Sequence, residues 1–112
     1  MGTFVVTGSA SGMGREAAQR LRDRGHTVIG VDQRCADVVA DLSIPDGRRD
    51  AAEAVLSTSA GVLDGAVLAA GLGPVPGRVR QIAEVNFFGV VDLLSAWRSA
   101  LAAGGCAIPV HA

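Results

Sequence analysis

Three glycines near the amino end have the spacing of a loop that binds phosphate. Gly8, Gly12 and Gly14 form the pattern Gly-x-x-x-Gly-x-Gly after a short apolar run, residues 4–6, and before a stretch of helical character. Glycine permits a tight turn and lets the backbone approach a ligand closely. The start of the helix then offers unpaired N–H groups and the positive end of its dipole to an anion. This arrangement predicts a site for a pyrophosphate group.

An acidic residue stands where such a site needs a partner for a sugar. Asp32 lies 18 residues beyond Gly14, at the end of the next apolar run. A carboxylate at this position accepts hydrogen bonds from both hydroxyls of an adenine ribose and repels a 2′-phosphate. Asp32 therefore favours NAD over NADP, although Arg34 would partly offset the repulsion. Alone, Asp32 is equally a solvated turn residue, but the order of loop, strand and acid favours the dinucleotide.

Composition and charge argue against several other kinds of chemistry. The 112 residues suit one domain, 1–112, and the net charge of −1 gives no basic surface for nucleic acid or an anionic membrane. The two cysteines and two histidines are too sparse for a metal site, and the cysteines fit reduced thiols of an intracellular protein. Without a signal peptide or a membrane-spanning apolar run, we expect a soluble cytoplasmic protein.

Hydrophobic patterning predicts alternating buried strands and helices, which is typical of a parallel α/β sheet. The expected strands are 3–7, 27–31, 37–40, 65–70 and 106–110. The expected helices are about 13–24, 44–57 and 78–103, with Gly25 ending the first, Ser43 as N-cap of the second, and Gly104 and Gly105 ending the third. Pro109 specifies the last strand poorly, because proline lacks the N–H that a central strand needs. The fold class is a Rossmann-like doubly wound sheet of about five strands and three helices.

Two segments beyond the fourth strand bear on binding. The loop 71–77 carries three glycines and two prolines, and loops at strand ends are where this architecture binds its ligand. Apolar residues recur every three positions over 78–103, from Val79 to Trp97. This pattern predicts a broad apolar face that packs in the core or pairs with another helix.

Five segments are distinctive in sequence and in order: the loop 7–14, GHTVIGVD (25–32), ADLS (40–43), VLAAGLGP (67–74) and VNFFG (85–89). Together they resemble the N-terminal half of the short-chain dehydrogenase/reductase family, especially its bacterial 3α-hydroxysteroid dehydrogenase/carbonyl reductase branch. The resemblance implies NAD as cofactor, and it implies these cofactor-binding residues: Gly8, Ser11, Gly12, Met13 and Gly14 at the pyrophosphate, Asp32 at the ribose, Asp41 and Leu42 at the adenine, and Ala69, Ala70 and Gly71 at the central strand. Ala69 stands where the family commonly has Asn. The resemblance also implies Asn86 as a catalytic residue that helps to hold the proton-relay water.

The chain departs from the family in the residues that perform the chemistry. The family uses a Ser, a Tyr and a Lys beyond the fifth strand, and a general acid or base must be within reach of the reacting oxygen. This chain contains neither Tyr nor Lys, and its ten basic residues are all arginine. Ser95 and Ser99 lie on the expected long helix and are not substitutes.

We therefore expect a truncated oxidoreductase of the hydroxysteroid or carbonyl class that is catalytically incomplete as this chain. A non-catalytic NAD-binding or regulatory module is the alternative, since both would keep the loop 8–14 and Asp32. A half-sheet would also leave an unpaired edge and an apolar helix face, so homo-oligomerisation through the 78–103 helix is a further expectation.

Overall fold

The computed structural model of the chain describes residues 2–71, 77 and 79–109, and a five-stranded parallel sheet lies at its centre. The strands are β1 (Thr3–Thr7), β2 (Thr27–Asp32), β3 (Val38–Val39), β4 (Leu63–Leu68) and β5 (Leu101–Pro109). Their spatial order is β3-β2-β1-β4-β5. The chain thus winds from the central β1 to one edge and then to the other, which confirms the predicted doubly wound fold.

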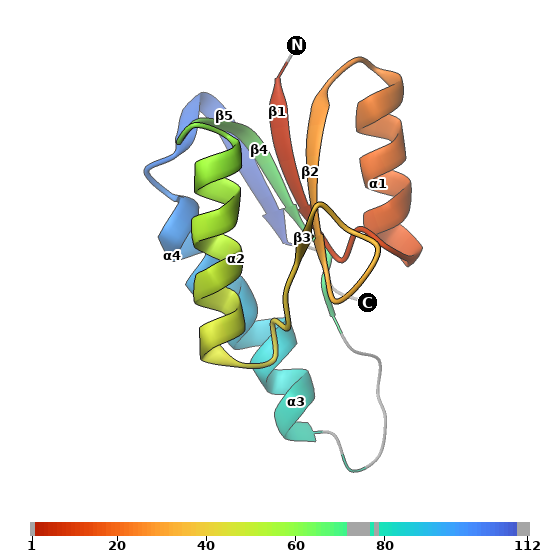
Figure 1. The fold of residues 1–112 in the computed structure, drawn as a ribbon, viewed down its shortest axis with the longest axis vertical. Coiled ribbons are helices and arrows are strands. Elements are labelled where there is room, and N and C mark those ends of the chain that lie inside the picture. Colours follow the sequence, from red (N-terminus) through yellow and green to blue (C-terminus); the bar gives the residue numbers. More distant parts are fainter. Residues whose placement is uncertain (1, 72–76, 78, 110–112) are drawn as a thin grey trace.

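Helices cover both faces of this sheet (Figure 1). The helix α1 (Gly12–Asp23) packs on one face, while α2 (Pro45–Thr58) and α4 (Gly89–Trp97) pack on the other. The short helix α3 (Val79–Ala83) and the π-helix η1 (Glu84–Phe88) run directly into α4. No helix among the described residues is both long and apolar enough to cross a membrane.

Successive side chains of β1 point to opposite faces of the sheet, so they belong to two separate parts of the hydrophobic core. Val6 packs with Ala18 and Val28 beneath α1, whereas Val5 joins the larger cluster beneath α2 and α4. Both valines of β1 are fully buried. A strand covered on both faces must be apolar throughout, which is why residues 4–6 form a continuous apolar run.

Gly25 ends α1 as the sequence predicts. Its φ of +86° is in the left-handed region, its N–H donates to the carbonyl of Arg22 at 2.9 Å, and the N–H of His26 donates to the carbonyl of Leu21 at 3.1 Å. This pair of bonds satisfies carbonyls that the helix end would otherwise leave unpaired.

The third helical segment is shorter than predicted. It ends at Trp97, and residues 101–105, which we expected to complete and stop it, belong to β5. Leu63 pairs with Leu101, and the N–H of Leu63 donates to the carbonyl of Ala100 at 2.8 Å. Backbone N–H and C=O groups along β4 need hydrogen-bond partners, and they pair with a segment for which local propensity predicts a helix. β4 itself begins and ends two residues earlier than the predicted strand 65–70.

The apolar face predicted at every third position of this segment is only partly buried. Phe88 and Val91 are exposed, while Val85 and Trp97 are buried. With about 3.6 residues per turn, positions three apart drift around the helix and cannot all share one face. The buried set follows steps of four instead: Val85, Gly89, Leu93 and Trp97.

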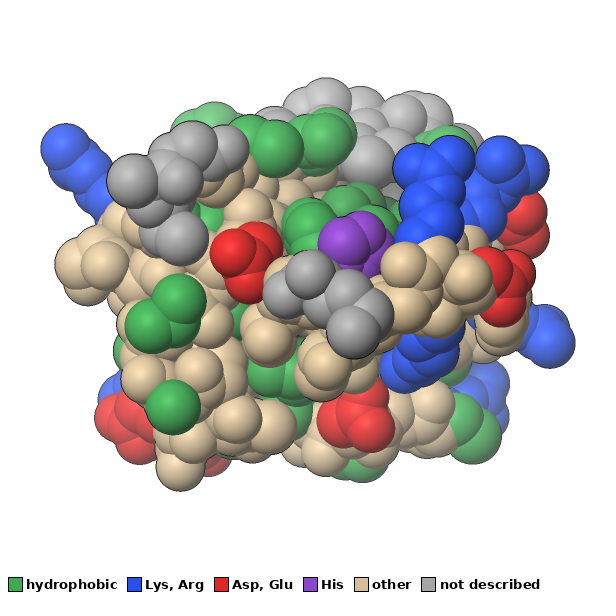
Figure 2. Space-filling model, turned by 90° about the horizontal axis from the view of Figure 1, so that it is seen from above, with side chains coloured by type: hydrophobic (Ala, Val, Ile, Leu, Met, Phe, Trp, Pro, Cys, Tyr) green, Lys and Arg blue, Asp and Glu red, His purple; other side chains and the backbone are tan. Residues whose placement is uncertain are grey.

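Figure 2 looks onto the end of the sheet where the strands begin, where a histidine side chain lies among hydrophobic and acidic ones. The N–H of Gly2 donates to Nδ1 of His26 at 3.0 Å, and the His26 ring packs edge-on against Phe4 with 4.8 Å between ring centroids. The N–H of Thr3 donates to the carboxylate of Asp64 at 2.7 Å. His26 therefore has structural partners, and it lies at the opposite end of β1 from the glycine loop.

A candidate dinucleotide cleft at the carboxyl edge of the sheet

A cleft of about 460 Å³ opens at the carboxyl ends of β1, β2 and β4. Most of the predicted cofactor-binding residues line it: Gly8, Ser11, Gly12, Met13, Asp32, Leu42, Ala69, Ala70 and Gly71. Gln33, Ala40 and Val85 line it as well. In a doubly wound sheet this is the topological switch point, where the chain leaves neighbouring strands in opposite directions and ligands bind.

The glycines of the loop are required for two different reasons. Gly8 has a φ of +73°, its N–H donates to the carbonyl of Val31 at 2.7 Å, and an added Cβ would lie 2.8 Å from backbone atoms of Ala70. Gly12 has a φ of +58°, but an added Cβ would meet nothing within 4 Å. Gly8 therefore permits close packing between β1 and the end of β4, whereas Gly12 keeps one wall of the cleft open.

The start of α1 lies at the cleft, since Ser11, Gly12 and Met13 line it. Ser11 is the N-cap and makes no side-chain capping hydrogen bond, and the first turn contains no acidic residue. Such a helix end carries partial positive charge and unpaired donors, which suit an anion. Gly14 does not line the cleft. It is buried behind the loop, where a Cβ would clash with the carbonyl of Gly8, so it lets α1 pack closely on the loop.

Asp32 ties the glycine loop to the end of β2. Its Oδ2 accepts a hydrogen bond from the N–H of Ala10 at 3.0 Å, and its Oδ1 accepts one from the N–H of Gln33 at 2.6 Å. Each carboxylate oxygen can accept about two hydrogen bonds, so both keep capacity for a ligand hydroxyl. Asp32 thus orders the loop and still presents an acceptor to the cleft.

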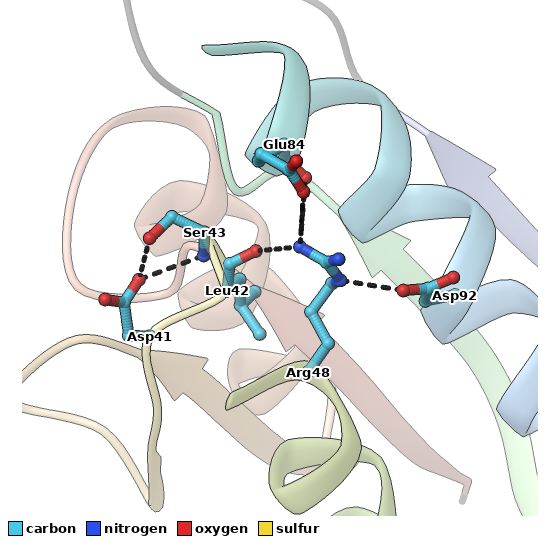
Figure 3. Close-up of polar contacts among 6 residues, drawn as sticks. All are labelled: Asp41, Leu42, Ser43, Arg48, Glu84 and Asp92. Carbon is cyan, nitrogen blue, oxygen red and sulfur yellow. Dashed lines mark hydrogen bonds and ion pairs between the residues drawn. The ribbon is translucent and has the colours of Figure 1, made fainter. Parts of the chain in front are cut away.

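Asp41 does not line the cleft, although its neighbour Leu42 does. The Asp41 carboxylate accepts hydrogen bonds from Oγ of Ser43 at 2.5 Å and from its N–H at 2.9 Å (Figure 3). These two bonds lower the pKa of Asp41 below its usual range, and the bond from the hydroxyl has the larger effect. The predicted N-cap role of Ser43 is wrong: its hydroxyl is engaged by Asp41, and Ile44 is the N-cap of α2 without a capping side chain.

The other wall of the cleft follows β4. The N–H of Ala69 donates to the carbonyl of Thr7, and the N–H of Ala70 donates to the Thr7 hydroxyl, both at 3.2 Å. Gly71 lies against Asn86, because a Cβ on Gly71 would stand 3.1 Å from the Oδ1 of Asn86. Asn86 sits in η1 beside Val85, at the margin of the cleft and not among its lining residues. The rest of the predicted ligand loop, residues 72–76, lies outside the described residues, as do Val110 and His111.

Sequence reasoning missed Arg48, which is buried behind the cleft (Figure 3). Its Nε donates to the carboxylate of Asp92 at 2.8 Å, and its Nη1 donates to the carbonyl of Leu42 at 3.1 Å and pairs with the carboxylate of Glu84 at 3.3 Å. Its position three residues before Ala51, on the apolar face of α2, was the available signal. An arginine on such a face needs partners from another element.

No metal centre is assembled in the part of the chain that is described, since no three His, Cys, Asp or Glu side chains gather there. Cys35 and Cys106 are both free and exposed. The cleft offers backbone donors, one carboxylate and small apolar walls, which together can bind a ligand that carries a diphosphate and a sugar.

Comparison with known proteins supports this description. No family model matches the chain. It is 39% identical over 104 residues to a 3α-hydroxysteroid dehydrogenase/carbonyl reductase of Comamonas testosteroni, covering 93% of this chain and 40% of that protein. It is 39% identical over 115 residues to a coniferyl-alcohol dehydrogenase of a Pseudomonas strain, covering 96% and 42%.

A solved structure agrees with these sequence relatives. The 3α-hydroxysteroid dehydrogenase of Pseudomonas sp. B-0831, complexed with NADH, matches at a TM-score of 0.85 and 46% identity over 88% of this chain and 39% of that one. The chain thus spans about two fifths of the length of these relatives. By sequence and by fold, it is similar to the N-terminal portion of short-chain dehydrogenases.

Proposed function

We propose that this chain binds NAD in the cleft and is the dinucleotide-binding portion of an oxidoreductase for a hydroxysteroid or carbonyl substrate. The observation that carries the proposal is the meeting of three features in one cleft: the loop 8–14, the uncapped start of α1, and Asp32 at the end of β2. The relatives support the substrate class, since two of them are 3α-hydroxysteroid dehydrogenases.

Each part of a dinucleotide has candidate partners among the residues at the cleft. Gly8, Ser11, Gly12 and Met13 would hold the pyrophosphate, with Gly14 supporting them from behind. Asp32 would accept hydrogen bonds from the adenine ribose, and Leu42 would contact the adenine, supported by the Asp41–Ser43 turn. Ala69, Ala70, Gly71 and Asn86 would stand toward the nicotinamide end. Bound NAD would supply a hydride acceptor, and the chain's own residues would bind and orient it.

Asp32 also favours NAD over NADP in this proposal. Its carboxylate would repel a 2′-phosphate at the adenine ribose, whereas it accepts hydrogen bonds from a free hydroxyl. Arg34 is exposed and lies two residues after Asp32, and its positive charge would offset part of that repulsion. We therefore expect a preference for NAD that is finite and depends on ionic strength.

We further propose that this chain does not turn over substrate by itself. It contains no Tyr and no Lys, so the residues that it carries include neither of the groups with which the family moves a proton. Asn86 would act only together with such groups. The same observation supports the second candidate, a module that binds NAD for regulation without reacting. A polypeptide carrying the missing Tyr and Lys that restores turnover when added would favour the enzyme.

A titration of the isotopically labelled chain with NAD, followed by nuclear magnetic resonance, tests the binding proposal. We expect millimolar affinity, about −4 kcal/mol, with shifts at the amides of residues 8–14. Asp32→Ala should weaken binding by about tenfold, because hydrogen bonds to a charged acceptor are among the stronger ones. Asp23→Ala, which removes an exposed carboxylate at the far end of α1, should change nothing.

Two results would contradict the proposal. Unchanged affinity in Asp32→Ala would mean that the site is elsewhere. Formation of NADH from a 3α-hydroxysteroid by this chain alone would overturn the claim that it is catalytically incomplete.

We also propose that the chain self-associates through the outer face of η1 and α4. Phe87 and Phe88 are 60% and 46% exposed and pack edge-on at 5.1 Å between ring centroids, and Val91 extends the patch at 44% exposure. Large apolar side chains grouped on a surface favour association.

A further inference from the structure

We infer that Arg48 is a positioning residue that sets the shape of the adenine end of the cleft. The inference rests on the proposed function, because it concerns how that same site is built. Arg48 lies on α2 and does not line the cleft. It acts through Leu42, which lines the cleft, and through Glu84, whose neighbour Val85 lines it.

The guanidinium joins three segments that are far apart in sequence. Its Nη1 donates to the carbonyl of Leu42 at 3.1 Å and pairs with the carboxylate of Glu84 at 3.3 Å. Its Nε donates to Asp92 on α4 at 2.8 Å. Leu42 lines the cleft, and so does Val85, the neighbour of Glu84. One side chain therefore bridges the loop before α2 and the π-helix, and both segments contribute residues to the lining of the cleft.

Arg48, the Leu42 carbonyl and the Glu84 carbonyl meet beside a glycine, Gly89. A Cβ on Gly89 would stand 3.4 Å from the carbonyl oxygen of Glu84, 3.7 Å from that of Leu42 and 3.8 Å from Cδ of Arg48. Gly89 is buried, so these groups meet in the protein interior. Two carbonyl oxygens and the Arg48 side chain thus surround one buried glycine at ordinary contact distances, which brings the two segments and Arg48 together at one point.

Burial makes arginine specific at this position. The Arg48 side chain is 5% exposed, whereas those of Glu84 and Asp92 are 27% and 51% exposed. The planar guanidinium presents donors in several directions at once, so it can bond to a carbonyl and to two carboxylates. A lysine would keep the charge, but its single ammonium would not span the Leu42 carbonyl and Asp92 together. Removing the cation would leave two carboxylates facing a buried gap.

The test separates the adenine end from the pyrophosphate loop by using two probes. The labelled full chain is titrated with AMP and, separately, with inorganic pyrophosphate, and amide shifts are followed at Leu42 and Val85 and in the loop 8–14. Arg48→Met should weaken AMP binding by about tenfold and abolish the shifts at Leu42 and Val85, while pyrophosphate binding stays within about twofold. Arg48→Lys should behave like Arg48→Met for AMP.

Matched variants distinguish positioning from general destabilisation. Arg49→Met removes the neighbouring arginine of the same helix, which is exposed and, among the described residues, forms ion pairs with Asp46 and Asp50. This variant should bind AMP like the wild type. Val55→Ala destabilises the same helix from the core, away from the cluster, and should also keep its AMP affinity at temperatures where it is folded. Asp92 lies on the exposed side of the cluster, so Asp92→Asn is the alternative variant if Arg48→Met does not fold. Asp92→Asn should weaken AMP binding about threefold.

Equal AMP affinity in wild type and Arg48→Met, or in wild type and Asp92→Asn, would overturn the inference and leave the proposed function intact. Equal losses of AMP affinity in Val55→Ala and Arg48→Met would also overturn it. If neither probe shifts the wild-type amides, the proposed function fails, and the inference fails with it.

Discussion

At the scale of single residues, Gly8 and Gly12 differ in what a side chain would cost: backbone strain at both positions, and a steric clash at Gly8 alone. Both have positive φ, but only at Gly8 would a Cβ meet backbone, at 2.8 Å from Ala70. We expect Gly8→Ala to lower the free energy of unfolding by about 3 kcal/mol, from left-handed strain and overpacking, and Gly12→Ala to lower it by about 1 kcal/mol. Urea denaturation measures the difference. Equal losses would show that the end of β4 is not in contact with the loop.

The Asp41 carboxylate makes stability depend on pH. Hydrogen bonds from Ser43 lower its pKa in the folded chain, so the folded state binds this proton less readily than the unfolded state does. The resulting stabilisation is fully present above the ordinary pKa of aspartate, about 3.9, and is lost as the pH falls through the lower folded value.

Ser43→Ala tests this sign. The variant lacks the hydroxyl that is the larger cause of the shift, so we expect the pKa of Asp41 to rise toward its usual range. The stability lost relative to wild type should be present at pH 7 and should shrink as the pH falls below the ordinary pKa of aspartate. Carbon-detected titration of the carboxylate measures the pKa, and a stability difference that grows on acidification would contradict the assignment.

At the scale of elements, the contact between α2 and α4 depends on one aromatic side chain. Trp97 is 1% exposed, and its Nε1 donates to the carbonyl of Ala52 at 3.3 Å. Trp97→Phe should lower the free energy of unfolding by about 2 kcal/mol, since it removes volume and a buried hydrogen bond. Circular dichroism follows the transition. Phe87→Leu, on the exposed face of the same segment, should stay within about 0.5 kcal/mol of wild type.

The elements that sequence predicted best are those with local signals. β1, α1 and its stop at Gly25 follow from an apolar run, a glycine loop and a Schellman turn, all set by neighbours in sequence. The fate of residues 101–105 depended on the edge of β4, some 40 residues earlier in the chain. Local propensity does not depend on that edge, so it predicts helix for residues 101–103 and a helix stop at Gly104 and Gly105.

The residues at the cleft divide in the same way between local and long-range signals. Gly8, Gly12 and Asp32 form a motif whose spacing is fixed by the strand and helix between them, and the structure brings all three to one cleft. Arg48 acts through groups contributed by other elements, so its importance emerges only once α2, η1 and α4 are packed together.

At the scale of the whole molecule, association is the property that the surface most directly predicts. Phe87→Ser combined with Phe88→Ser should lower the average mass measured by sedimentation at concentrations where the wild type associates, because it removes the apolar patch on η1. Ile44→Ser, at a site that is 48% exposed elsewhere on the molecule, is the control and should leave the mass unchanged. A monomeric wild type over the same range would contradict the proposal.

The position of β1 at the centre of the sheet has a consequence for how the molecule is made. During synthesis, β2 emerges soon after β1 and can pair with it, but the flank of β1 that receives β4 stays bare until residues 63–68 have left the ribosome. The bond from Ala70 to Thr7 joins groups 63 positions apart. Closing so long a loop is slow. The pairing of β1 with β4 can nevertheless begin before the cleft is complete, since the cleft includes Val85, and β5 can join the sheet only later still.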